Sequence, residues 1–147
     1  MGLPMSKRKI TSNNRSDRTE WTTELSLRER IKELNCLYEV GRAVEKYGER
    51  LEELFKAVVK ILPPSWLYPE VACARISFEG KRQKSANFKE SPWVIAADIL
   101  AQGRRVGVVE VHYLENKPVL DEGPFLKEER SLIDAVAADA IVAYRLL

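Results

Sequence analysis

Residues whose types could do chemistry lie at alternating positions of two predicted strands. Cys73 and Arg75 lie in the segment VACARISF, and Glu110 and His112 lie in VVEVHY. Since side chains two apart along a strand point to one face, Arg75, Glu110 and His112 are expected to converge on one side of a sheet. Three ionisable groups in a half-buried pocket would anchor a polar small molecule. The alternative is that Arg75 and Glu110 pair across strands on a solvated face, with little effect on stability.

The two cysteines give a weaker chemical signal. Cys36 lies in an apolar helix and Cys73 in an apolar strand, a placement typical of buried free thiols in a reducing compartment. A small haem or redox protein using Cys73 and His112 is a third interpretation, although a strand thiol without a neighbouring base more often serves packing. A single histidine and no CxxC argue against structural zinc, and no nucleophile-elbow, P-loop or paired-carboxylate motif occurs. We therefore assign no catalytic residue and no metal ligand, and leave the cofactor unknown.

These strands must be positioned by helices, and the helix predicted over Leu27–Tyr47 carries more apolar surface than one core needs. It has two apolar stripes at helical spacing, whereas a surface helix usually has one. Two stripes predict a helix that packs on its own domain and on a second copy, and the alternative is one wide face buried in one core. The first stripe follows coiled-coil spacing and consists of Leu27, Ile31, Leu34, Tyr38 and Gly41; the second consists of Leu37, Val40, Val44 and Tyr47.

The remaining elements follow in a simple order. Ser26 is expected to cap the first helix, and a second helix is predicted over residues 49–62, ended by two prolines. Strands are predicted over 71–78, 82–88 (an edge strand), 93–101 and 105–114, with a hairpin turn at Gln102-Gly103-Arg104. A long helix is predicted from Gly123–Pro124 to the end. The chain is expected to be α+β: an antiparallel sheet with two N-terminal helices and one long C-terminal helix on one face.

Composition and charge exclude several classes. The hydrophobic share of 45% and charged share of 31% are those of a globular domain, and no apolar run could span a bilayer. No secretory signal is evident, so we expect a cytoplasmic protein. The net charge of the chain is +2, and the first twenty residues alone have a net charge of +3, so the remaining residues sum to −1. This distribution argues against nucleic acid as a partner of the folded part. Residues 1–23 are predicted to be a basic, disordered tail and residues 24–147 the folded domain.

Five local strings resemble GAF-type input domains of the kind placed ahead of histidine kinase cores. They are LNCLYEVGR, PPSWLYPE, CARI, NFKESPW and LDEGPFLKEER, and the similarity runs from about Leu27 to Ala143. The resemblance implies a GAF-like sensory domain of signal transduction, non-enzymatic and homodimeric, with a signalling-protein partner and a small-molecule effector. Two departures stand out: the segment 78–93 is short, so a pocket roof would be thin, and no phosphoacceptor or ATP-binding segment follows Leu147.

The resemblance and the residue patterns together define two candidate sets. The candidate ligand-binding residues are Arg75, Glu110, His112, Cys73 and Trp93. The candidate dimer-interface residues are Leu27, Ile31, Leu34, Tyr38, Ile141 and Tyr144. The alternative to a sensory domain is a purely structural interaction module whose pocket is filled by its own side chains.

Overall fold

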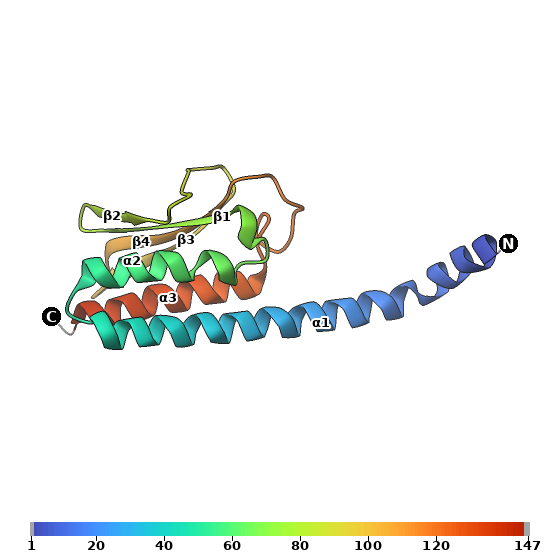
Figure 1. Ribbon diagram of the computed structural model, residues 1–147, viewed down its shortest axis with the longest axis horizontal. Helices are drawn as coiled ribbons and strands as arrows, with labels where there is room; N and C mark the ends of the chain where they lie inside the picture. The colour runs from blue at the N-terminus through green and yellow to red at the C-terminus, as the bar shows by residue number, and fades with distance from the viewer. Residues whose placement is uncertain (1, 146–147) are drawn as a thin grey trace.

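The computed structural model describes the backbone of residues 2–145 and the side chains of residues 23–144. It is an α+β fold in which a four-stranded antiparallel sheet carries helices on one face (Figure 1). Helices α2 (Leu51–Ile61) and α3 (Lys127–Arg145) lie against the sheet, and α1 (Gly2–Tyr47) packs on both of them as an outer layer. The predicted class and element order, two helices before an antiparallel sheet and one after it, are confirmed.

Helix α1 is much longer than predicted. It begins at Gly2 and passes through Ser26 without interruption, so the predicted helix start at Ser26 is wrong. The positions that join the core are Cys36, Val40 and Ala43, which recur at steps of four and three. The side chains of residues 2–22 lie outside the described residues, and the prediction of a disordered tail over 1–23 stays a prediction.

Helix α2 packs on β1 and β2, and two short turns connect it to the sheet. Pro63 and Pro64 follow α2 directly, and since proline has no backbone N–H, the helix ends there as predicted. Two 3₁₀ turns, Pro63–Ser65 and Pro69–Val71, then lead into the first strand. Between them Trp66 is fully buried.

The sheet has the order β2-β1-β4-β3, and alternation divides its side chains as predicted. Ile76 and Val109 are register partners on the helix side and are buried, whereas Arg75 and Glu110 are partners on the opposite side, called here the outer face. The strands are β1 (Ala72–Phe78), β2 (Lys81–Lys84), β3 (Val94–Ala101) and β4 (Arg104–Tyr113).

Two connections of the sheet decide where a site can lie. The predicted hairpin turn is present but one residue shorter, because Arg104 already belongs to β4. Gln102 and Gly103 have positive φ, 53° and 77°, as a tight two-residue turn requires. The predicted edge strand over 82–88 is wrong in its second half, because β2 ends at Lys84. Residues 85–93, called here the cover loop, instead run over the outer face.

Helix α3 starts later than predicted. Gly123 has a φ of 57°, and Glu122 and Phe125 form an isolated β-bridge, so the helix begins only at Lys127. Its buried side chains Leu132, Ile133 and Val136 pack in the core as expected. Among the described helices, none combines the length and apolar character needed to cross a membrane.

Candidate functional site

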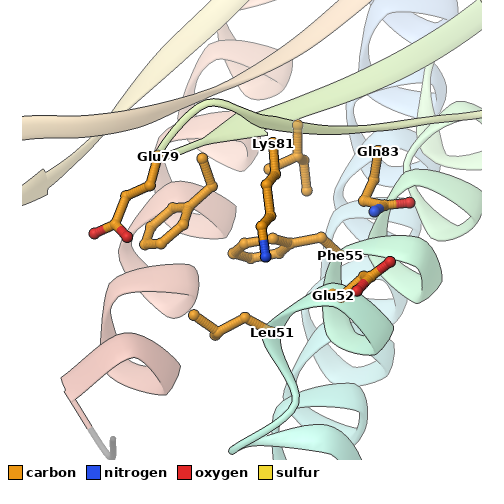
Figure 2. Close-up of a pocket in the computed structure, with 8 residues that line it drawn as sticks. Leu51, Glu52, Phe55, Glu79, Lys81 and Gln83 are labelled. Atoms are coloured by element: carbon orange, nitrogen blue, oxygen red, sulfur yellow. The ribbon is translucent and has the colours of Figure 1, made fainter.

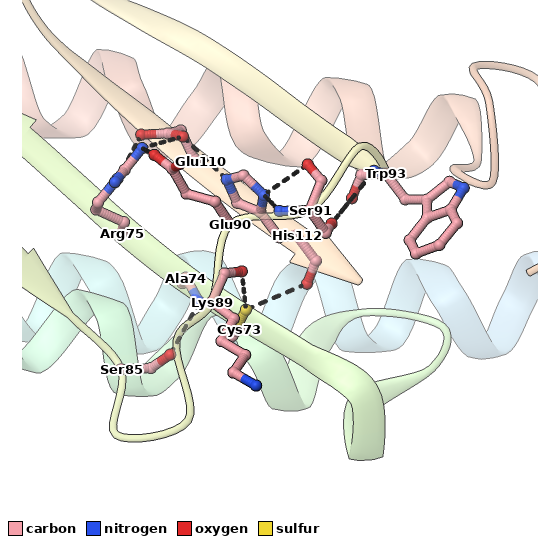
Figure 3. A network of polar contacts seen from close by, with 10 residues as sticks. All are labelled: Cys73, Ala74, Arg75, Ser85, Lys89, Glu90, Ser91, Trp93, Glu110 and His112. Carbon is pink, nitrogen blue, oxygen red and sulfur yellow. Dashed lines mark hydrogen bonds and ion pairs between the residues drawn. The ribbon is translucent and has the colours of Figure 1, made fainter. Parts of the chain in front are cut away.

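Arg75, Glu110 and His112 form one connected cluster on the outer face (Figure 3). Arg75 Nε and Nη2 donate to the two carboxylate oxygens of Glu110, both at 2.9 Å, and His112 Nε2 lies 2.9 Å from Glu110 Oε1. The predicted convergence of the three ionisable side chains is therefore present. Arg75 and Glu110 do pair across neighbouring strands, as the alternative expected, but their side chains are only 11% and 12% exposed, so the pair does not lie on a solvated face.

The electrostatics of the cluster fix its charges near neutral pH. Burial by itself would raise the pKa of Glu110, but hydrogen bonds from His112 and Arg75, with the charge of Arg75, outweigh it and lower that pKa to about 2. The hydrogen bond to Glu110 in turn raises the pKa of Arg75. The centre of the outer face is thus a permanent ion pair with a histidine attached to it.

The cover loop supplies further partners to this ion pair. Glu90 Oε1 lies 3.0 Å from Arg75 Nη2, which gives the guanidinium a second carboxylate. The ring of Phe88 lies 4.8 Å from the guanidinium carbon of Arg75 and edge-on to His112, with 5.2 Å between ring centroids. Groups of the chain itself therefore occupy the positions over Arg75 that an anionic or aromatic ligand would take.

His112 uses both of its ring nitrogens within the chain. The backbone N–H of Ser91 lies 3.0 Å from His112 Nδ1, the Ser91 carbonyl oxygen lies 3.3 Å from the same nitrogen, and Nε2 lies 2.9 Å from Glu110 Oε1. An imidazole engaged on both sides holds the cover loop against β4. It presents no lone pair to a metal or a haem.

Cys73 is the register partner of His112 and is equally enclosed. Its Sγ lies 3.5 Å from the carbonyl oxygen of Lys89 and 3.6 Å from that of His112. Burial raises the pKa of the Cys73 thiol, and it raises that of Cys36 to about 11. Since the thiolate is the reactive and metal-binding form, this environment disfavours redox or ligand chemistry at either cysteine.

Trp93 lies apart from the cluster. Its indole points away from Arg75, while its backbone carbonyl accepts a hydrogen bond from Tyr113 N at 2.9 Å. Phe88, Glu90 and Ser91 are not identified from the sequence as parts of the site, since Phe88 is assigned there to a strand and residues 89–92 are given no position. The run NFKESP, with its asparagine, serine and proline, is the signal of a loop that could have found them.

The predicted interface residues of α1 are free on the surface, whereas those of α3 are partly used by the core. Ile141 and Tyr144 are half-buried, and the Tyr144 ring contacts that of Phe78 with 5.3 Å between centroids. Val142, which is not among the predicted interface residues, is a large apolar residue of α3 that is exposed, at 51%. On α1 the exposed fractions are 59%, 51%, 60% and 65% for Leu27, Ile31, Leu34 and Tyr38.

Neither a search for metal-binding side chains nor a comparison with known proteins assigns a further site. Within the described residues, no group of His, Cys, Asp and Glu side chains is arranged to hold a metal ion. Comparisons of the chain with protein-family models, curated proteins and solved structures gave no match.

Proposed function

We propose that this chain is a non-enzymatic, GAF-like regulatory domain that forms a homodimer through α1 and responds to a small-molecule effector. The observation that carries the dimer is the exposed apolar stripe Leu27, Ile31, Leu34 and Tyr38, called here the seam. Its residues follow steps of four and three along one side of the helix, as in a coiled coil.

The core does not need the seam. Cys36, Val40 and Ala43 already bury the opposite side of α1 against α2 and α3. Four large apolar side chains in a row on a solvated helix face are a typical interaction surface. A second copy would cover them with an identical stripe under two-fold symmetry, and a small shift of the packed helices could then pass a signal along α1.

Analytical ultracentrifugation of the full chain tests the dimer. The double variant Ile31→Glu/Leu34→Glu should sediment as a folded monomer, since both positions are exposed within one chain and their charging costs the core nothing. The matched control Ser26→Glu/Asn35→Glu adds the same charge at exposed positions outside the seam and should remain dimeric.

Two results would remove the proposal. If the wild-type protein is monomeric at high micromolar concentration, the seam does not form a dimer interface. Equal dissociation of the seam variant and the control would mean that net charge, and not the seam, governs association.

A purely structural interaction module is the second candidate, and the cover loop favours it. Phe88, Glu90 and Ser91 fill the outer face with the chain's own groups, as a domain without an effector would. The two candidates differ in whether any small molecule stabilises the purified domain. A screen of thermal unfolding with metabolites separates them, because a ligand at a hundred times its Kd adds about 2.7 kcal/mol.

A further inference from the structure

A cavity of about 160 Å³ lies on the helix side of the sheet, between the first turns of α2 and the β1–β2 hairpin (Figure 2). A closed cavity of about 150 Å³ in another protein holds a benzene molecule, so this volume suits one small apolar group. The lining residues are Leu51, Glu52, Phe55, Ile76, Phe78, Glu79, Lys81 and Gln83.

The cavity exists because β2 has polar residues at the positions that face the helices. Lys81 and Gln83 are the register partners of Phe78 and Ile76, so they lie on the helix-facing side of the sheet. At such positions a strand normally places apolar side chains that pack on the helix below. Here two polar side chains stand over α2 at the sheet edge, and the space above Phe55 is left unfilled.

The floor of the cavity is apolar and aromatic. Phe55 and Phe78 are buried, and their rings meet at a tilted angle of 53° with centroids 5.3 Å apart. Leu51 and Ile76 complete this floor. An apolar group placed on it would be partly removed from water, which favours binding.

The rim carries both signs of charge. Figure 2 shows Lys81 extending from the hairpin over the cavity, with Glu79 on one side and Glu52 on the other. Among the described residues no ion pair joins Lys81 or Glu79 to any group, and Glu52 makes only a 3.9 Å contact with Lys56. One ammonium and two carboxylates, all on exposed side chains, thus stand around an apolar floor.

We infer that this cavity binds a free α-amino acid with an apolar side chain. The side chain lies on Phe55 and Phe78, the α-carboxylate pairs with Lys81, and the α-ammonium pairs with Glu52 or Glu79. A hydrocarbon would leave the three charges unused, and a simple carboxylic acid would meet two repelling carboxylates. A zwitterion with an apolar group uses the apolar floor and all three charges of the rim.

Isothermal titration calorimetry of the full chain with L-leucine and L-phenylalanine is the test. At least one of them should bind, and glycine, which has no side chain for the floor, should not. Leucinamide lacks the carboxylate and 4-methylpentanoate lacks the ammonium, so each should bind about tenfold more weakly than leucine.

Three variants locate the site. Lys81→Gln should weaken leucine binding about tenfold, whereas the matched control Lys84→Gln, three residues along the same strand and exposed, should not. Gln83→Phe should fill the cavity and abolish binding while the fold stays cooperative. The inference goes beyond the proposed dimer, and calorimetry reads binding alone, so either proposal can fail without the other.

Three outcomes overturn the inference. They are no binding of leucine or phenylalanine at low-millimolar concentration, equal affinity for leucine and 4-methylpentanoate, and leucine binding that survives Gln83→Phe.

Discussion

Glu129 is a buried carboxylic acid whose ionisation should make the stability of this domain depend on pH near neutrality. The residue is 2% exposed and lies in the first turn of α3. Its Oε1 accepts a hydrogen bond from Leu126 N and its Oε2 one from Leu67 N, both at 2.8 Å. It therefore ties the start of α3 to the segment that leads into the sheet.

Opposing effects set the pKa of this carboxyl. Burial raises it most, the two backbone N–H groups lower it, the charge of Glu29 raises it and that of Lys32 lowers it, which leaves the pKa at about 7. The Tyr113 hydroxyl, 3.4 Å from Oε2, donates a further, weaker hydrogen bond.

The sign of the effect follows from the raised pKa. An ordinary glutamate in the unfolded chain ionises near 4.5, so between pH 4.5 and 7 only the unfolded state loses this proton, and stability falls as pH rises. Between pH 5 and 8 the loss should be about 2.5 kcal/mol, since each pKa unit is worth about 1.4 kcal/mol. Above the folded pKa the loss levels off.

Urea unfolding of wild type and of Glu129→Gln, followed by tryptophan fluorescence at pH 5, 6, 7 and 8, measures this contribution. The variant should be less stable than wild type at pH 5, because an amide cannot accept from both N–H groups, and the gap should narrow as pH rises. Glu115→Gln, at an exposed acid, is the control and should follow the wild-type curve. Parallel curves for Glu129→Gln and wild type over this range would refute the reasoning.

Three further variants should act through single identified causes. Gly107→Ala should lower the free energy of unfolding by about 1–3 kcal/mol, because a β-carbon there would collide with the Ser77 carbonyl oxygen; unchanged thermal unfolding would contradict this. Phe125→Ala should cost about 3–5 kcal/mol in urea unfolding, since the ring is 1% exposed, and a loss near zero would mean that the ring is not buried. Glu110→Gln should cost about 1.5–3 kcal/mol because it leaves Arg75 with one carboxylate, and a silent variant would show that the outer-face ion pair is solvated.

The parts of the fold that could be predicted were those set by local pattern. The apolar face of α2, the two prolines after it and the alternate facing of side chains along β1 and β4 each depend on a few neighbouring residues, and each was confirmed. The convergence of Arg75 and Glu110 followed from the same alternation, because antiparallel register places them opposite each other.

What escaped prediction depended on contacts between distant segments. The cover loop lies where it does because Glu90 and Ser91 bind groups of β1 and β4, which the loop's own sequence does not reveal. Glu129 carries no local sign of burial, since it belongs to a charged first helical turn, Lys127–Arg130. The inward position of Lys81 also depends on the register of β2, which its polar sequence leaves open.

The cavity lies next to the C-terminal end of α1, the helix that carries the seam. Leu51, in the cavity floor, follows the last residue of α1 after a link of three residues, 48–50, and Arg50 N donates to Tyr47 O at 2.5 Å across that link. A ligand that fixes the first turn of α2 therefore constrains the end of the helix that carries the seam. If monomer and dimer bind leucine with different affinities, linkage requires leucine to change the dimer's Kd by the corresponding factor. Sedimentation of wild type with and without saturating leucine measures that factor, with Gln83→Phe as the variant that should not respond. A dimer Kd that leucine leaves unchanged, in protein shown to bind it, would mean that the cavity and the seam work independently.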